Sequence, residues 1–523
     1  MTEAGPEDPE TEMVAAASAP YGEDVEPLGI RTFHGVKWSY LSTIGSFVVQ
    51  MGYTATISRL IGPGTFGTLA LAQVVLRFGT YFSQLGIGPA IVQKRDLEGD
   101  DIQVAFTVST LLGAFFTLGF IALSPLAASW LRDPELADVV AWMAPVFLLS
   151  GLGAVANALL RRQLRFRALA AIDFGSYAIA YPLVGVALAW AGAGTASLVA
   201  AAITQAALLS GFSWLAARHR LRPKWVRSRA RSLVHFGGWV SVTGFMDFLG
   251  GNADTFAVGR FSGTATLGQY NRATLLVGLP AYHVVNNANR VLLPSFSRIQ
   301  AQEDRFRVAY VGGMALLLAF VIPMVAITIA LAGAMVAVLF GPQWQFAATL
   351  IPYVAIGATL DRLISFPAIL TEARGRVRTM AAIQFVHLVL AVVLVAGVVA
   401  RNGGVKELAL AWAGGQAATY VIYLLYMQQQ LQPDAWQLAR AHAECILLSL
   451  VAAAPAVLFD HVGSLPALAQ VVGGGLLGTV AYLATLALLP GLIVRRELNR
   501  LGLEAMLTNR FGPWVPLRFR SPT

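Results

Sequence analysis

The side chains that could carry chemistry in this sequence are charged residues inside long apolar runs. Six of them interrupt such runs: Arg77, Asp247, Asp254, Arg272, Asp361 and Arg362. A charge at the centre of a membrane helix costs about 2.5–3.5 kcal/mol, so each should face a partner or an aqueous cavity. Arginine binds phosphate through two parallel hydrogen bonds, and a carboxylate in a membrane cavity can exchange a proton or a sodium ion. This inventory suits an amphipathic cargo that carries a phosphate group.

Some of these charges could instead stabilise one another. Asp254 and Arg272 lie near the ends of successive apolar runs joined by a tight turn. They could form an ion pair; alternatively, Asp254 could carry a coupling ion. Asp247 lies seven residues before Asp254 and hence on the same helix face. Arg362 has Asp361 as its only acidic neighbour in sequence, and adjacent helix positions point apart, so we expect Arg362 to face the cargo rather than this neighbour.

The sequence contains few features that are typical of an enzyme. The chain contains no GxxxxGK[ST] phosphate loop, which argues against ATP hydrolysis. Its seven histidines are scattered and its single cysteine, Cys445, lies in an apolar run, so we expect no metal site, no cofactor and no disulfide. The loops between the apolar runs are short. We therefore predict a transporter rather than an enzyme, with no catalytic residue.

The helices that must position these charges are numerous and apolar. Hydrophobic residues make up 56% of the 523 residues and charged residues only 12%, against about 25% charged in soluble domains. Apolar runs of eighteen residues or more are typical of transmembrane helices. We predict an all-α integral membrane protein with about fourteen spans, at 34–60, 66–93, 102–126, 138–160, 170–191, 194–217, 234–260, 265–292, 308–333, 345–372, 377–400, 406–427, 442–461 and 466–490.

Basic residues fix the expected orientation of these spans. Most of the 37 lysines and arginines fall in alternate loops, and such loops face the cytoplasm under the positive-inside rule. We therefore place both termini in the cytoplasm and the protein in the cytoplasmic membrane. The same rule explains the net charge of +9, which would otherwise suggest a nucleic-acid partner; we expect none.

A repeated turn indicates that the chain contains the same unit twice. "SRLIGPGTFGTLALA" (58–72) and "GRFSGTATLGQYNRA" (259–273) match at five of fifteen positions with a constant offset of 201 residues. Six predicted spans separate the copies, so both turns face the same side. This arrangement predicts two pseudo-symmetric six-helix lobes in parallel, plus two C-terminal helices.

The residues of the repeated turn suggest two roles. Gly62, Gly64 and Gly67 should permit a tight connection and a close approach of helices. Arg59 and Arg260 end their helices, where they could contact a phosphate or simply anchor the helix at the membrane interface.

The repeat and the charge pattern together predict the organisation of the whole chain. We expect a disordered acidic cytoplasmic tail (1–30), a first lobe with helices 1–6 (31–217), a basic cytoplasmic linker (218–233), a second lobe with helices 7–12 (234–428), helices 13–14 (429–490) and a basic cytoplasmic tail (491–523). The linker could bind anionic lipid headgroups or serve only as a topology anchor.

Several motifs resemble a known family. They are "ISRLIGPGTFGTLALAQ" (57–73), "LGIGPAIVQKRDLEGDD" (85–101), "LLRRQLRFRALAAIDF" (159–174), "DTFAVGRFSGTATLGQYNRA" (254–273) and "VLLPSFSRIQ" (291–300). Their order resembles that in bacterial Wzx-type oligosaccharide flippases, a branch of the multidrug/oligosaccharidyl-lipid/polysaccharide exporter superfamily. Within that branch the motifs are most similar to those of the colanic-acid and teichuronic-acid exporters.

The resemblance implies a function and a site. The cargo would be an undecaprenyl-pyrophosphate-linked oligosaccharide, turned from the inner to the outer leaflet by alternating access of two lobes around a central cationic cavity. Membrane lipids, a polysaccharide polymerase and glycosyltransferases would be its partners. The candidate cargo-binding residues are Arg59, Arg77, Arg260, Arg272 and Arg362, and the candidate ion-coupling residues are Asp247, Asp254 and Asp361.

Two other functions remain open. One is a cation-coupled multidrug exporter of the same fold, against which the motifs "LRFRALA" and "SRIQ" argue. The other is a membrane-embedded polysaccharide polymerase or glycosyltransferase, against which the short loops and the lack of a DxD motif argue.

Overall fold

The described part of the protein is helical throughout. A computed structural model describes residues 45, 47–83, 87–94, 97–163, 165–218, 222–229, 244–246, 248–278, 296, 302–461, 465–489 and 491–500, and these residues form no strand. Ten helices among them are long and apolar enough to cross a membrane. The all-helical membrane architecture is thus confirmed. The count of fourteen includes segments outside the described residues and stays a prediction.

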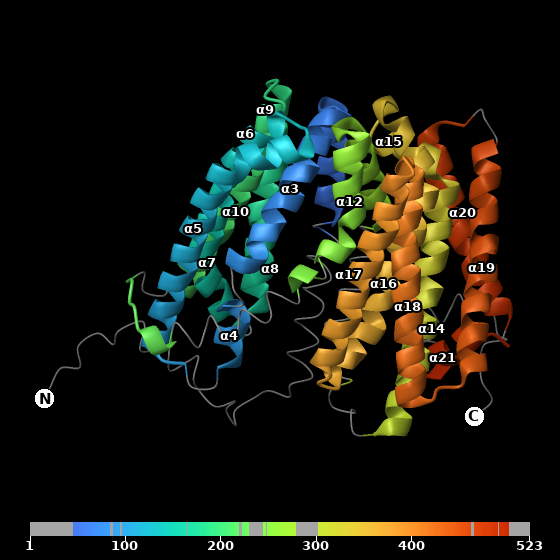
Figure 1. The fold of residues 1–523 in the computed structure, drawn as a ribbon. Helices are drawn as coiled ribbons and strands as arrows, with labels where there is room; N and C mark the ends of the chain where they lie inside the picture. Colours follow the sequence, from blue (N-terminus) through green and yellow to red (C-terminus); the bar gives the residue numbers. More distant parts are fainter. Residues whose placement is uncertain are drawn as a thin grey trace, which may run out of the picture. The chain divides into compact units, whose positions relative to one another are not determined.

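The chain forms two compact units, of which the first comprises Met1–Asn271 and Leu339–Gln343. Its helices are α3 (Pro63–Ser83), α4 (Ile87–Gln93), α5 (Gly99–Leu131), α6 (Glu135–Met143), α7 (Pro145–Arg162), α8 (Phe166–Ala178), η1 (Ile179–Gly185), α9 (Val186–Trp190), α10 (Thr195–Ala217), α12 (Ala253–Ala257) and η2 (Val258–Ser262). Within this unit α7 lies between α5 and α10 (Figure 1).

Small residues allow α5, α7 and α10 to approach closely. A Cβ atom added to Gly151 of α7 would lie 2.4 Å from the carbonyl oxygen of Ser109 in α5. One added to Gly153 would lie 2.4 Å from the hydroxyl oxygen of Ser210 in α10. Helices in lipid gain little from apolar burial and associate by such close packing. The first unit therefore has a rigid scaffold against which the other helices are placed.

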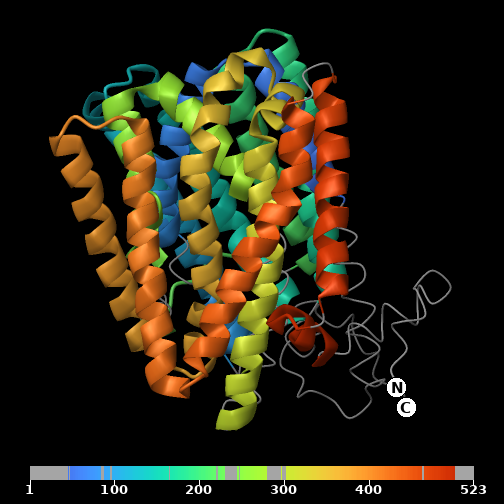
Figure 2. The same ribbon diagram turned by 90° about the vertical axis from the view of Figure 1, so that its right-hand side faces the viewer.

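The second unit comprises Arg272–Val338 and Trp344–Thr523. Its helices are α14 (Glu303–Ala330), α15 (Ala332–Leu339), η3 (Pro342–Trp344), α16 (Gln345–Ala373), α17 (Val377–Ala400), α18 (Val405–Leu431), α19 (Ala435–His461), α20 (Ala467–Leu488) and α21 (Ile493–Arg500). The last residue of α15, Leu339, and the first two residues of η3 are assigned to the first unit. The pairs α17 with α18 and α19 with α20 lie side by side (Figure 2). Residues of α14, α16, α18, α19 and α21 share one buried apolar core.

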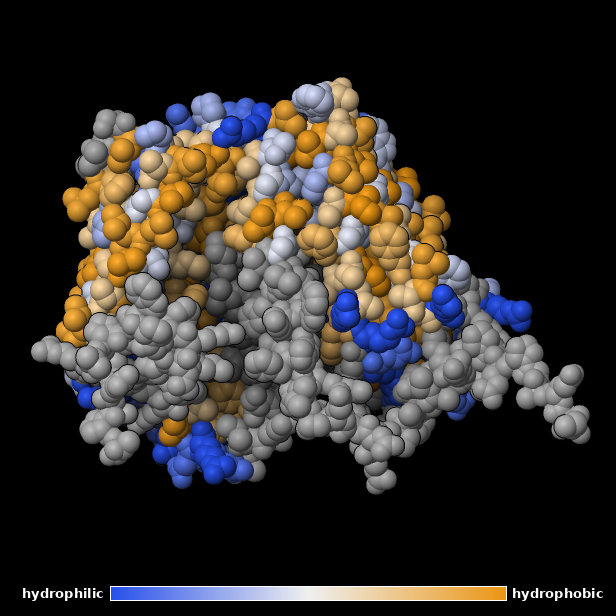
Figure 3. Space-filling view, turned by 180° about the vertical axis from the view of Figure 1, so that it is seen from behind, coloured by the Kyte–Doolittle hydropathy of each residue, from blue (hydrophilic) through white to orange (hydrophobic). Residues whose placement is uncertain are grey.

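The outer surface of the helices suits contact with lipid. Large apolar side chains such as Phe115, Leu118, Leu458 and Leu476 are exposed. On the face shown in Figure 3, apolar surface covers much of the described part, and hydrophilic residues gather near its upper and lower edges. Soluble proteins rarely expose apolar patches of this extent. The protein is therefore a multi-pass membrane protein.

Candidate functional site

The two repeated turns lie against each other within the first unit. A Cβ atom added to Gly67 would lie 1.7 Å from the carbonyl oxygen of Thr264, and one added to Gly268 would lie 1.9 Å from that of Pro63. Gly268 follows Gly67, and Thr264 follows Pro63, by the same 201 residues as in the sequence repeat. Each glycine thus meets the first residue of the helix in the other copy, and we call this symmetric contact the turn pair.

Only one of the three glycines of the first turn makes the close approach that we expected. Cβ atoms added to Gly62 or Gly64 would meet nothing within 4 Å, unlike one added to Gly67. The expectation of close helix approach is therefore wrong for the first two glycines. In the second turn Gly263 has a φ of +84°, a left-handed conformation that side chains disfavour.

A third segment joins the turn pair. The side-chain amide of Gln343 donates a hydrogen bond of 2.6 Å to the carbonyl oxygen of Ser58, the first residue of the first copy (58–72). The side-chain amide of Gln269, within the second copy (259–273), donates one of 2.7 Å to the carbonyl oxygen of Gln343. These bonds hold 253–271 and Leu339–Gln343 to the first unit. The first compact unit ends at Asn271, whereas the sequence repeat predicts a boundary between lobes at 218–233. The two six-helix lobes are inferred from the repeat in the sequence, and they stay a prediction.

Asp254 and Arg272 have partners other than each other. Asp254 is 3% exposed and accepts a hydrogen bond from the hydroxyl of Tyr270, itself fully buried. Arg272, in the second unit, is buried, and its guanidinium carbon lies 5.6 Å from the ring centroid of Trp344. The structure thus replaces the proposed ion pair by a phenol–carboxylate bond and a cation–π contact. Tyr270 was missed because only charged residues were considered as partners.

Variants of the Tyr270–Asp254 hydrogen bond can distinguish a structural role of Asp254 from a role in ion coupling. Tyr270→Phe should lower membrane abundance, because the buried carboxylate of Asp254 loses its phenol donor and keeps the 3.3 Å hydrogen bond from the Thr255 hydroxyl, at a cost of about 1–3 kcal/mol. Replacing both partners in Asp254→Leu/Tyr270→Phe should restore most of the abundance, since the carboxylate and the phenol are both removed and only the partly buried Thr255 hydroxyl loses an acceptor. The measurement compares membrane abundance and transport activity in the single and double variants. A double variant with restored abundance but no export would make Asp254 an ion-coupling residue; restored export would make it structural.

The remaining candidate arginines differ in their surroundings. Arg77 in α3 is exposed, as is Gln73 one turn before it, and in the part of the chain that is described Arg77 has no hydrogen-bond or ion-pair partner. Arg362 in α16 contacts the carboxylate of Asp361. Our expectation that these neighbours point apart was wrong, because the long arginine side chain reaches back to the shorter one.

The two arginines that end the repeated helices lie near the turn pair. Arg59 is exposed, and a Cβ atom on Gly341 would lie 3.7 Å from its Cγ. Arg260 is partly buried, with its guanidinium carbon 5.4 Å from the ring centroid of Phe261. Asp247 lies outside the described residues. The structure therefore brings Arg59, Arg260 and Asp254 to one end of the first unit, and places Arg77 further along α3.

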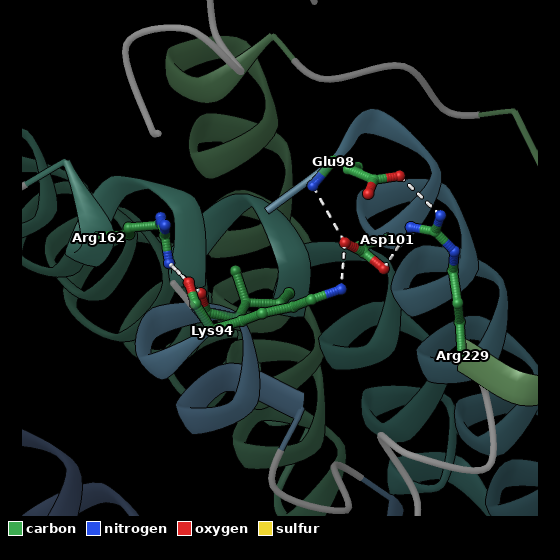
Figure 4. Close-up of polar contacts among 6 residues, drawn as sticks. Lys94, Glu98, Asp101, Arg162 and Arg229 are labelled. Atoms are coloured by element: carbon green, nitrogen blue, oxygen red, sulfur yellow. Dashed lines mark hydrogen bonds and ion pairs between the residues drawn. The ribbon is translucent and has the colours of Figure 1, made fainter. Parts of the chain in front are cut away.

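A polar cluster lies at the start of α5, and it was not predicted as a site from the sequence. Asp101, whose side chain is 6% exposed, contacts Lys94 and accepts a 2.7 Å bond from Nη1 of Arg229. Nη2 of Arg229 lies 2.6 Å from a carboxylate oxygen of Glu98, and Figure 4 shows these side chains converging at the start of α5. We call these four residues the linker cluster. Both hydrogen bonds raise the pKa of Arg229 above its usual value.

The linker cluster fixes part of the basic linker to the first unit. Lys224 contacts the carboxylate of Asp100, and its backbone N–H donates a 2.8 Å bond to the hydroxyl of Thr107. Arg162 donates a 2.9 Å bond to the carbonyl oxygen of Ile91. A cavity of about 280 Å³ lies beside the cluster. Two of the linker's basic residues therefore pair with acids of the chain itself, a role that the acidic run "DLEGDD" (96–101) could have suggested.

Comparison with known proteins identifies related sequences. The sequence pattern of a family described as polysaccharide biosynthesis protein matches residues 56–349 of this chain. The teichuronic acid biosynthesis protein TuaB of Bacillus subtilis (strain 168) is 23% identical over 347 residues, which cover 65% of this chain and 71% of that protein. Residues 56–349, which the family pattern matches, include the turn pair, Arg77 and the linker cluster.

Two solved structures share the fold. The lipid II flippase MurJ in an inward closed conformation aligns with a TM-score of 0.70 at 12% identity, over 86% of this chain and 97% of that chain. A multidrug resistance MATE family transporter of the MOP superfamily, inward-facing, aligns with a TM-score of 0.57 at 14% identity, over 74% of this chain and 94% of that chain. The fold is thus one found in both a lipid flippase and a drug transporter.

Proposed function

Because this chain belongs to the family of polysaccharide biosynthesis proteins, we propose that it flips an undecaprenyl-pyrophosphate-linked oligosaccharide across the cytoplasmic membrane by alternating access. The name of the teichuronic acid relative and the flippase fold support this function. Both termini and the linker face the cytoplasm under this proposal, as the distribution of basic residues predicts. The flipped oligosaccharide would pass from glycosyltransferases on the inner side to a polymerase on the outer side.

The exposed guanidinium of Arg77 is the observation that carries the proposal. Arg77 is the fifteenth of the 21 residues of α3, about 20 Å along the helix at 1.5 Å per residue. Under this proposal α3 crosses the membrane, which places Arg77 about 9 Å from the Ser83 end of the helix and inside a hydrocarbon core of about 30 Å, where an exposed arginine borders water, a lipid headgroup or an anion. A pyrophosphate offers the bidentate acceptor that a guanidinium binds best. Arg362 is a weaker candidate, because Asp361 already neutralises part of its charge.

Replacing Arg77 tests whether it holds the phosphate of the cargo. Arg77→Ala should reduce surface polysaccharide about tenfold or more, since a charge-assisted hydrogen bond contributes about 1.5–3 kcal/mol, and Arg77→Lys should retain part of it. Arg378→Ala, at an exposed arginine at the start of α17, is the matched control and should export normally. Export is measured relative to protein abundance in a deletion strain complemented with each variant. Normal export from both Arg77 variants would exclude Arg77 as a phosphate ligand, and failure of Arg77→Ala to accumulate would make its role structural.

The deletion strain itself distinguishes the flippase from a drug exporter. Loss of the protein should remove surface polysaccharide and leave resistance to a cationic dye such as ethidium unchanged. Retained polysaccharide together with increased dye sensitivity would overturn the proposed function.

A further inference from the structure

Three tyrosines cluster in the first unit, away from the positions that tyrosines usually take in membrane proteins. The rings of Tyr177 and Tyr181 stack with centroids 4.8 Å apart and planes at 29°, and Tyr53 meets Tyr181 edge-on at 5.1 Å. All three are partly exposed. Tyrosine is enriched at the membrane–water interface. Tyr181, however, lies about 22 Å from one end and about 13 Å from the other of the span Phe166–Trp190.

An irregular turn of helix carries part of this cluster. The span is α-helical up to Ala178 and then forms the π-helical turn η1, which contains Tyr181 and Pro182. Pro182 cannot donate a backbone hydrogen bond, so it favours a local departure from the α-helix. Single π-helical turns within α-helices occur frequently at functional sites. A Cβ atom on Gly185 would lie 3.5 Å from a ring carbon of Tyr53, so this turn also packs against the helix at 47–60.

The exposed side of this span that carries the tyrosines is polar. Asp173 is exposed and lies one turn before Tyr177, on the same side of α8. The apolar residues Ile179 and Leu183 are exposed elsewhere on the span. An exposed carboxylate within a span does not face lipid. Asp173 therefore faces an interaction partner within the protein or a polar space, and the side with Asp173, Tyr177 and Tyr181 is not a lipid-facing surface.

We propose that Tyr53, Tyr177 and Tyr181 form a stacking surface for the pyranose rings of the cargo, with Asp173 as an acceptor for sugar hydroxyls. This assignment rests on the proposed function for the presence of a sugar. The C–H face of a pyranose packs on an aromatic ring, and a phenol hydroxyl both donates to and accepts from sugar hydroxyls. None of these four side chains is basic, which leaves the neutral oligosaccharide rather than the pyrophosphate as the part of the cargo that this surface suits.

A cation-binding cage is the competing explanation of three aromatic rings beside a carboxylate. In a cage the ring faces surround the cation. Here the faces of Tyr177 and Tyr181 are turned toward each other with centroids only 4.8 Å apart, which leaves no room for an ammonium group between them. The geometry therefore favours a flat ligand on the outer face of the stacked pair.

Substitutions that keep or remove the ring test the stacking surface in cells. Tyr181→Phe should export within about twofold of the wild type, whereas Tyr181→Ala and Tyr177→Ala should each lower export about fivefold, as expected for loss of one aromatic contact. Phe115→Ala, at an exposed aromatic residue of α5, is the control and should export normally. Normal export from Tyr177→Ala and Tyr181→Ala would overturn the proposal.

Photocrosslinking gives a readout that does not depend on export. The full-length protein with benzoylphenylalanine at position 181 or 177 is irradiated in cells that make polysaccharide, and adducts are stained for periodate-oxidisable sugar. Sugar-bearing adducts are expected at 181 and 177 but not at position 115. Equal labelling at all three positions, or labelling abolished by tetraphenylphosphonium, would overturn the sugar assignment, the latter in favour of a cation site. If export still depends on Arg77 while this surface takes no sugar, only the stacking surface fails; if deletion leaves surface polysaccharide intact, the proposed function fails.

Discussion

Gly67→Ala and Gly268→Ala are each expected to lower the amount of folded protein in the membrane about tenfold or more. The added methyl group would overlap the carbonyl oxygen of Thr264 or of Pro63, at 1.7 Å and 1.9 Å. Both obstacles are backbone atoms at the first residue of a helix, which cannot rotate away as a side chain would. Overpacking usually costs about 1–3 kcal/mol, and here relief requires the two helices to separate. The measurement is membrane abundance together with thermal unfolding of the purified protein.

The same turn supplies matched controls. Gly62→Ala and Gly64→Ala add the same methyl group where nothing lies within 4 Å, so both variants should accumulate and export normally. The double variant of Gly67 and Gly268 should be less destabilised than the sum of the single effects, because one separation of the helices relieves both contacts. Normal abundance of Gly67→Ala would show that the turn pair does not form in the membrane.

Reversing the charge of Arg229 is expected to release the linker from the first unit. Arg229→Glu places a third carboxylate beside Asp101 and Glu98, and it removes two charge-assisted hydrogen bonds. The unfolding temperature should fall and cleavage should accelerate, because two charge-assisted hydrogen bonds are replaced by repulsion between carboxylates. The measurement is the thermal unfolding of the purified protein and the rate at which trypsin cleaves after Lys224.

Arg227→Glu is the control for the Arg229 reversal. Arg227 is exposed and, within the described residues, has no ion-pair partner, so the change in net charge is identical while the linker cluster stays intact. Equal cleavage rates and unfolding temperatures for the two variants would show that the cluster does not hold the linker. High salt should speed cleavage of the wild type only modestly, because the carboxylate of Asp101 is largely shielded from solvent.

Local patterns in the sequence were sufficient for the helical architecture and for the repeat. Long apolar runs predict helices because a single segment in lipid can satisfy all of its backbone groups internally only as a helix, and the repeated turns predict a shared geometry at Gly67 and Gly268. The sequence alone could not show that these two glycines face each other's helices, since that contact joins residues about 200 positions apart.

Side-chain partners were harder to predict than helices. Asp254 pairs with a neutral phenol rather than with an arginine, and hydrogen bonding by neutral groups leaves no charge pattern to detect. The contact between Arg362 and Asp361 depends on rotamers, which helix periodicity does not determine. Asp173 carried a signal that was available, a carboxylate within an apolar run four residues before a tyrosine.

The turn pair has the form of an isologous interface, in which residue i of one subunit meets residue j of the other and j meets i. Two-fold axes produce this pattern between identical subunits, but here a single polypeptide supplies both sides. A homodimer must repeat every residue, whereas a fused pair can diverge away from the shared contact. At the same offset of 201 residues, Arg77 corresponds to Gly278 and Tyr53 to Asp254. The two copies therefore keep one scaffold in common, including Arg59 and Arg260, while the guanidinium of Arg77 has no counterpart at Gly278, an asymmetry that suits a cargo with one charged end.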